Sequence, residues 1–140
     1  IITPFIAWII GDTVTAGSHL RPDTIMVYGG DIYVLDAKYY RYGVSLLPGD
    51  LPQTESVHKQ ITYGEYIASQ RRFAERYGEG MRIYNAFLMP YDASDPRFAG
   101  GQPLRRIGEA VSDWKGNQKS YERVQGILVD VKDLMRIAAG

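Results

Sequence analysis

The order of apolar and polar positions along the chain predicts a mixture of strands and helices. Two runs rich in β-branched and aromatic residues, 24–28 and 32–40, flank a Gly-Gly-Asp turn. This pattern predicts a β-hairpin, because glycine supplies the positive φ that a tight turn requires. A helix is expected from Thr54 or Ser56 to about Tyr77, since a short hydroxyl side chain can cap the first turn.

The rest of the chain alternates apolar runs with loops. The other expected elements are a strand or helix end at 5–10, a loop at 43–53, an apolar strand at 81–89, a long loop to Pro103, strands at 106–114 and 126–131, and a helical turn or two at 134–139. Strands on both sides of the main helix and a closing helix predict an α/β (α+β) sandwich with a central mixed β-sheet flanked by helices.

Composition narrows the class of protein. The 140 residues are the usual size of one domain, so we expect 1–140 to fold as a single unit. Sixteen basic and sixteen acidic residues balance, so net charge neither supports nor excludes a nucleic-acid partner. The absence of cysteine excludes disulfides and thiolate zinc sites and is typical of a prokaryotic cytoplasmic protein. The apolar run at 5–10 is far shorter than the roughly 20 residues that cross a membrane.

Three charged residues surround the predicted hairpin. Asp23 precedes the first strand, and Asp36-Ala37-Lys38 ends the second. In adjacent antiparallel strands these positions lie at the same edge of the sheet, so the two carboxylates can converge into an oxygen-rich site of the kind that Mg²⁺ prefers. Side chains alternate along a strand, so Asp36 and Lys38 are expected on one side and Ala37 on the other.

A lysine beside such a metal suits phosphodiester hydrolysis. Its ammonium group can hold the attacking water and offset the charge that gathers on the phosphate oxygens, while the metal lowers the pKa of its bound water. Acidic-x-Lys triplets also occur by chance on structural strands, so the triplet is informative only in its hairpin context. An apolar run, Ile32 to Leu35, that ends in a charge favours the functional interpretation.

Other residues allow two interpretations each. The two histidines, His19 and His58, are either general bases or surface residues. The three tyrosines, Tyr39, Tyr40 and Tyr42, either stack on nucleic acid or enter the core. The two tryptophans, Trp8 and Trp114, are assigned to the core or to an interface.

Longer strings resemble a known group of enzymes. They are Arg21-Pro22-Asp23, Val34 to Tyr40, Leu51-Pro52 and Lys59-Gln60-Ile61-Thr62-Tyr63. Together they resemble the cleavage domains of type II restriction endonucleases of the PD-(D/E)xK superfamily. The FokI cleavage domain similarly has a Pro-Asp, an Asp-x-Lys strand, a Leu-Pro loop and a glutamine-bearing helix. The LlaJI group is resembled more closely by two strings, Asp-Ala-Lys-Tyr-Tyr and Lys-Gln-Ile-Thr-Tyr.

The resemblance covers residues 20 to 68 and implies a restriction-endonuclease-like fold. It also implies that Asp23 and Asp36 bind Mg²⁺, with Mn²⁺ as a substitute, that Lys38 is the catalytic lysine, and that Gln60 supports the site from the helix. Relatives commonly carry a further acidic residue on a helix before the Pro-Asp strand, whereas here only Asp12 precedes it.

These observations predict a metal-dependent endonuclease that hydrolyses DNA, the cleavage domain of a type II restriction enzyme, with type IIS left open as the subtype. One such site cuts one strand, so a homodimer or a second nuclease subunit is expected for a double-strand break. The chain does not begin with methionine and is interpreted as a fragment of a longer protein whose recognition domain lies elsewhere. The alternative is a non-catalytic DNA-binding or assembly module of the same fold in a larger restriction or repair protein. RNA and branched DNA stay open as substrates.

Overall fold

The computed structural model describes residues 5–10, 13–19, 24–98 and 100–139. Its elements are, in chain order, β1 (Phe5–Ile10), β2 (Thr13–His19), β3 (Thr24–Tyr28), β4 (Asp31–Ala37), α1 (Tyr42–Ser45), the 3₁₀ turn η1 (Pro48–Asp50), α2 (Thr54–Ser69), α3 (Arg71–Tyr77), β5 (Ile83–Pro90), β6 (Leu104–Ala110), the 3₁₀ turn η2 (Ser120–Glu122), β7 (Val124–Val129) and α4 (Val131–Ala139).

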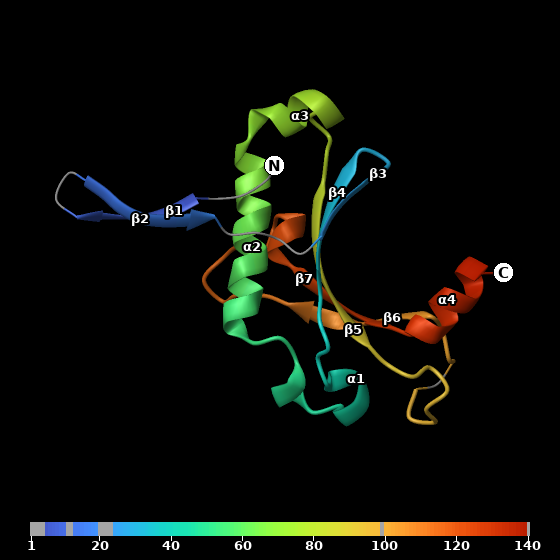
Figure 1. Ribbon diagram of the computed structural model, residues 1–140. Coiled ribbons are helices and arrows are strands. Elements are labelled where there is room, and N and C mark those ends of the chain that lie inside the picture. Colours follow the sequence, from blue (N-terminus) through green and yellow to red (C-terminus); the bar gives the residue numbers. More distant parts are fainter. Residues whose placement is uncertain (1–4, 11–12, 20–23, 99, 140) are drawn as a thin grey trace.

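Five strands form the central sheet in the order β3-β4-β5-β7-β6. The three middle strands, β4, β5 and β7, run parallel, and the two edge strands, β3 and β6, run antiparallel to their neighbours. With its flanking helices this is the mixed sheet that the sequence predicts, and it is compatible with the restriction-endonuclease-like fold. Strands β1 and β2 form a separate antiparallel hairpin, which extends beyond α2 on the left of Figure 1.

The predicted hairpin is confirmed as β3 and β4. Gly29 and Gly30 make the turn with φ of 60° and 85°, values that glycine adopts without strain. The register places Thr24 opposite Leu35 and Tyr28 opposite Asp31. The charged end of β4 therefore lies beside the start of β3.

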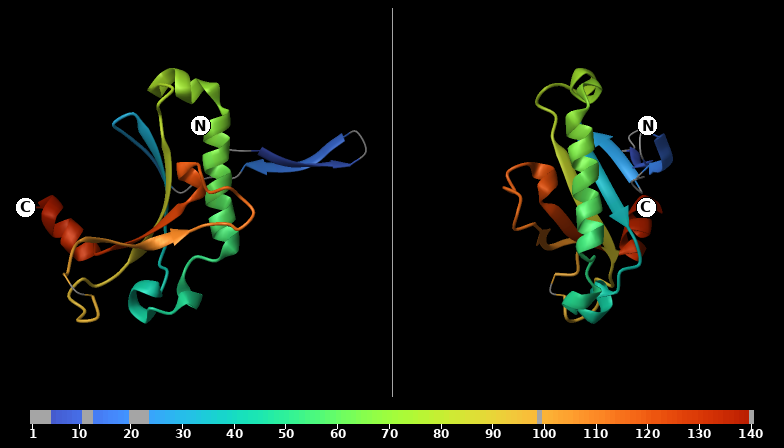
Figure 2. Two further views of the ribbon diagram at one scale, coloured as in Figure 1. Left: turned by 180° about the vertical axis from the view of Figure 1, so that it is seen from behind. Right: turned by 90° about the vertical axis from the view of Figure 1, so that its left-hand side faces the viewer.

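Helix α2 covers one face of the sheet, as Figure 1 and Figure 2 show from three directions. Its buried positions, Gln60, Ile61, Tyr63, Gly64 and Ile67, recur at the spacing of one helical face. They pack on apolar side chains of β4, β5 and β7 that point to the same side of the sheet. No helix in the described ranges is long and apolar enough to cross a membrane.

The close contact between α2 and η2 depends on a glycine. A Cβ at Gly64 would lie 2.5 Å from the Cβ of Tyr121, so only a residue without a side chain fits there. Tyr121 can consequently pack on the core cluster that contains Ile32, Val34, Tyr63, Ile67 and Ile83.

Several element boundaries differ from the sequence expectation. The helix expected to reach Tyr77 breaks at Gln70, whose extended backbone (φ −96°, ψ 105°) separates α2 from α3. Strand β2 was not predicted, α1 and η1 lie within the expected loop, β6 begins and ends earlier than expected, and α4 begins at Val131. Trp114 is not a core residue, since two thirds of its side chain, 66%, is exposed.

Candidate active site

The parallel strands place their carboxyl ends at one edge of the sheet. β4 ends at Ala37, β5 at Pro90 and β7 at Val129. In open α/β sheets this edge is where ligands usually bind, because the chain leaves each strand there in a loop. Asp36 and Lys38, the predicted pair, are at this edge.

Asp36 points to the side of the sheet that α2 covers. Ile32, Val34 and Asp36 are buried in alternation, and only 2% of the Asp36 side chain is exposed. The hydroxyl of Tyr40 donates a hydrogen bond of 3.0 Å to Asp36 Oδ2. Its ring meets that of Phe87 edge-on at 6.0 Å between centroids, and Phe87 is opposite Asp36 in the parallel register. Tyr40 therefore fixes the orientation of the carboxylate.

Lys38 is beside this carboxylate, as the strand alternation predicts. Its Nζ is 3.5 Å from Asp36 Oδ1, while Ala37 between them is exposed. The lysine side chain is 46% exposed, so its ammonium group is accessible from solvent as well as from Asp36. A cation at this place can reach a phosphate that approaches the sheet edge.

Gln60 lies beneath the same strand, one step in from the edge. Its Nε2 donates to the carbonyl of Val34 at 3.4 Å and to Asn85 Oδ1 at 3.5 Å. Asn85 Nδ2 returns a bond to the Gln60 carbonyl at 2.9 Å and a second to the Tyr121 carbonyl at 2.8 Å. This buried network joins α2, β4, β5 and η2. Through its bond to Val34, Gln60 holds β4, the strand that carries Asp36.

Asp23, the other predicted metal ligand, lies outside the described residues, as do Arg21 and Pro22. Its covalent neighbour Thr24 pairs with Leu35, which precedes Asp36. Within the described ranges no three His, Asp or Glu side chains gather into a group that could hold a metal ion. Asp36 is the carboxylate of the predicted metal-binding pair that lies within the described residues, and its oxygens are hard ligands that suit Mg²⁺.

Sequence reasoning gave no role to Tyr40 beyond stacking or core packing, and none to Asn85. Nothing in the one-dimensional pattern marks either residue, because each acts on a partner brought close by the fold. Of the other two tyrosines, only Tyr42 takes the expected core role, and stacking of Tyr39 on nucleic acid stays a prediction. Tyr39 is 95% exposed, whereas Tyr42 packs against the core.

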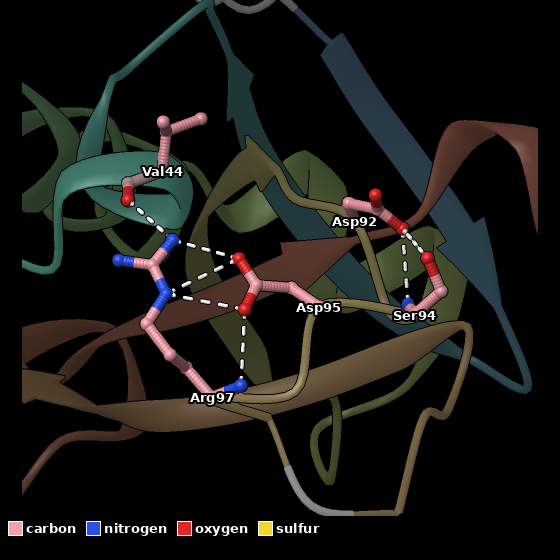
Figure 3. Close-up of polar contacts among 5 residues, drawn as sticks. All are labelled: Val44, Asp92, Ser94, Asp95 and Arg97. Carbon is pink, nitrogen blue, oxygen red and sulfur yellow. Dashed lines mark hydrogen bonds and ion pairs between the residues drawn. The ribbon is translucent and has the colours of Figure 1, made fainter.

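The loop after β5 is attached to α1 at this edge by an arginine. Figure 3 shows Arg97 reaching across to the carbonyl of Val44, to which its guanidinium donates at 2.7 Å. The same guanidinium donates hydrogen bonds to both carboxylate oxygens of Asp95. These bonds raise the pKa of Arg97 and lower that of Asp95 from their ordinary values. The contact holds the loop against the segment that follows Lys38.

A third aspartate at the edge has a structural role. Asp130 Oδ2 accepts the Ala93 N–H at 2.7 Å, and Oδ1 accepts the Asp133 N–H at 3.0 Å. Asp130 so ties the start of α4 to the turn after β5. The hydrogen bond from the Ala93 N–H is the main reason why the pKa of the Asp130 carboxyl is lowered. Burial alone would raise this pKa.

A comparison with known protein families identifies the family of this chain. The sequence profile described as LlaJI restriction endonuclease matches residues 7–101, about two thirds of the chain. The chain belongs to the LlaJI restriction endonuclease family. It is accordingly a restriction-type nuclease by family, and DNA is the substrate of such enzymes. No curated protein and no solved structure matched the chain.

The LlaJI family match contains every residue of the predicted site. Asp23, Asp36, Lys38 and Gln60 all lie between residues 7 and 101, as does Tyr40. Strands β6 and β7 and helix α4 lie beyond it, although β7 is a central strand of the sheet. The resemblance to the LlaJI group that was inferred from the sequence strings is confirmed by this match.

Proposed function

We propose that this LlaJI-family domain is a metal-dependent endonuclease, the cleavage domain of a type II restriction enzyme of the PD-(D/E)xK kind. The observation that carries the proposal is the arrangement of Asp36 and Lys38. A buried carboxylate ends a central strand, a tyrosine hydroxyl orients it at 3.0 Å, and an accessible ammonium group is 3.5 Å away. The combination of a hard oxygen ligand and a cation suits attack on a phosphodiester.

Mg²⁺, with Mn²⁺ as a substitute, would be held by Asp36 and Asp23. Bound there, it would supply Lewis-acid stabilisation of the phosphate and a more acidic water. A carboxylate has about four lone-pair sites, so Asp36 can bind a cation while it accepts the bond from Tyr40. The oxygen chemistry of the described part of the site therefore fits the ion.

The chain's own residues have distinct parts in the reaction. Lys38 donates hydrogen bonds to a non-bridging phosphate oxygen and to the attacking water, and its charge offsets the negative charge that builds up as the water oxygen bonds to phosphorus. Tyr40 and Gln60 are positioning residues, the first through the Asp36 carboxylate and the second through the strand at Val34. One phosphorus–oxygen bond forms as another breaks, so the DNA strand is cut.

Nicking of supercoiled plasmid tests this proposal. Wild-type protein is expected to convert it to open circles in Mg²⁺ and not in EDTA, and Asp36→Asn is expected to abolish the conversion. Glu75→Gln, an exposed carboxylate on α3 at the opposite edge of the sheet, is the matched control and should nick normally. Equal nicking by Asp36→Asn and wild type would contradict the assignment and favour a non-catalytic DNA-binding or assembly module.

We further propose that double-strand cleavage needs two copies, as a homodimer or with a second nuclease subunit, and that sequence recognition resides outside this chain. One site of this kind cuts one strand. The rate of linear product formation should therefore rise more steeply than the first power of protein concentration, whereas nicking should rise linearly. A linear dependence of both rates would contradict the requirement for a second copy.

A further inference from the structure

A groove of about 670 Å³ opens between the start of α2 and the segment that connects β6 to β7. In Figure 1 and Figure 2 this connecting segment, coloured orange, passes beside α2. Lys115 in the segment forms an ion pair with Glu65 on the helix, so the two walls are joined. The volume is within the range of about 300–1,000 Å³ that is usual for sites that enclose a small organic group.

The groove leads toward the candidate active site. Leu51, Pro52, Glu109 and Ala110 line it and also line a smaller apolar hollow of about 200 Å³. That hollow reaches Phe87, which is opposite Asp36 in the sheet and in edge contact with Tyr40. The hollow therefore connects the groove to the strand beside Asp36, on the side of the sheet that α2 covers.

An exposed tryptophan forms one wall of the groove. Lys115 Nζ is 4.7 Å from the centre of the Trp114 ring, and the same lysine is tied to Glu65, so the ring is held in place although it is largely in solvent. The imidazole of His58 lies 6.3 Å from it, tilted by 44°. A fixed, exposed aromatic face with a second ring nearby is a platform on which a flat heterocycle can stack.

The polar groups of the groove suit a base better than a phosphate. Asp113 adds a carboxylate that repels phosphate but accepts a hydrogen bond from an exocyclic amino group. The other acid, Glu109, is neutralised by Arg106 and Arg123. Ser112 lines the same wall, and its buried Oγ has no hydrogen-bond partner among the described residues.

We propose that this groove binds one unpaired DNA base next to the scissile phosphate, with the base stacked on Trp114 and its polar edge against Ser112 and Asp113. The identity of the substrate as DNA rests on the proposed function, whereas the recognition of an unpaired base rests on the groove. The backbone of the nucleotide stays outside, toward Lys38, because no lysine or arginine is among the described residues that line the groove.

Equilibrium binding in Ca²⁺, measured by fluorescence anisotropy, tests the groove without requiring cleavage. The probes are three labelled duplexes of one sequence: fully paired, carrying one bulged adenine or cytosine, and carrying an abasic bulge. The wild-type chain should bind the bulged-base duplex about tenfold more tightly than the other two, as expected for one stacked base. Trp114→Ala should bind all three alike, and Trp114→Phe should restore most of the preference.

The control is Tyr28→Ala, which removes an aromatic side chain of similar exposure, 74%, at the far end of the β3–β4 hairpin. It should keep the tenfold preference. Equal binding of the three duplexes by the wild type, or a preference that survives Trp114→Ala, would overturn the proposal. The binding preference is measured without cleavage, so a protein that does not nick DNA can still show it. If nicking depends on Asp36 but the bulged base is not preferred, the base-binding proposal is wrong and the proposed nuclease function stands.

Discussion

Tyr40 donates its hydroxyl hydrogen to Asp36 Oδ2 over 3.0 Å, across only four residues of chain. The bond forms because the chain turns back at the end of β4, where the Tyr40 amide also donates to the Lys38 carbonyl at 2.8 Å. The tyrosine ring packs against Phe87 in the core. A partly buried tyrosine that packs on the core therefore sets the direction of the carboxylate that we propose binds the metal.

Tyr40→Phe tests this positioning role. The ring and its contact with Phe87 remain, whereas the bond to Asp36 is lost. We expect nicking at limiting Mg²⁺ to fall by about tenfold, because partners that orient a metal ligand typically contribute 10- to 100-fold in affinity or activity. The Mg²⁺ concentration for half-maximal nicking should rise, a shift that a purely structural role would not cause. Tyr39→Phe, at an exposed position without a bond to Asp36 in the structure, should change neither value.

Lys38→Met separates chemistry from binding. The methionine keeps most of the length of the unbranched side chain but removes the charge that stabilises the developing phosphate charge. Nicking is expected to fall by about 100-fold or more, while affinity for a paired duplex in Ca²⁺ changes by less than threefold or so, since other contacts position the backbone. Lys59→Met, at a half-buried position on α2, is the matched control for loss of one positive charge. A parallel loss of affinity and rate in Lys38→Met would instead make Lys38 a binding residue.

Asn85→Leu tests the buried network that holds Gln60. The change leaves the Tyr121 carbonyl without its donor and removes both bonds between Asn85 and Gln60. We expect the free energy of unfolding to fall by about 2–3 kcal/mol, because a buried polar group that loses its partner keeps its full desolvation cost. Urea unfolding provides the measurement. Gln118→Leu, at an exposed position, should change the same quantity by less than about 0.5 kcal/mol.

Asp130 should contribute stability that depends on pH. Its pKa is lowered in the folded protein, chiefly by the Ala93 N–H, so the ionised form is favoured by folding. The contribution is therefore complete above the unfolded pKa, about 3.9, and disappears as the pH falls through the lower folded value. Asp130→Asn should reduce the free energy of unfolding at pH 7 by about 1–2 kcal/mol, since the amide cannot accept both N–H groups.

The same measurement at acid pH completes that test. The difference between wild type and Asp130→Asn should shrink as the pH is lowered below 4 or so. Glu79→Gln, an exposed substitution, should give a small difference that does not vary in this way. A penalty for Asp130→Asn that is as large at low pH as at pH 7 would show that the carboxyl charge contributes nothing to stability.

Local patterns were enough to predict the hairpin and the relation between Asp36 and Lys38. Glycines at the turn and alternation along β4 are properties of neighbouring residues, and they place Lys38 Nζ 3.5 Å from the Asp36 carboxylate. The break of the helix at Gln70 was not predictable in this way. Its backbone is extended although Gln70 and Arg71 are good helix formers, so propensity alone does not account for the end of α2 there.

The sequence by itself determined the family, the pairing of Asp36 with Lys38 in the candidate site, and the fold class. Each of these depends on short strings or on the periodicity of apolar residues. Only the tertiary structure decided that Tyr40 orients Asp36, that Asn85 and Gln60 join four elements, and that Trp114 borders a groove instead of entering the core. The reason is physical. These contacts join residues whose proximity depends on the order of strands in the sheet and on how α2 packs across it, and no local pattern encodes either.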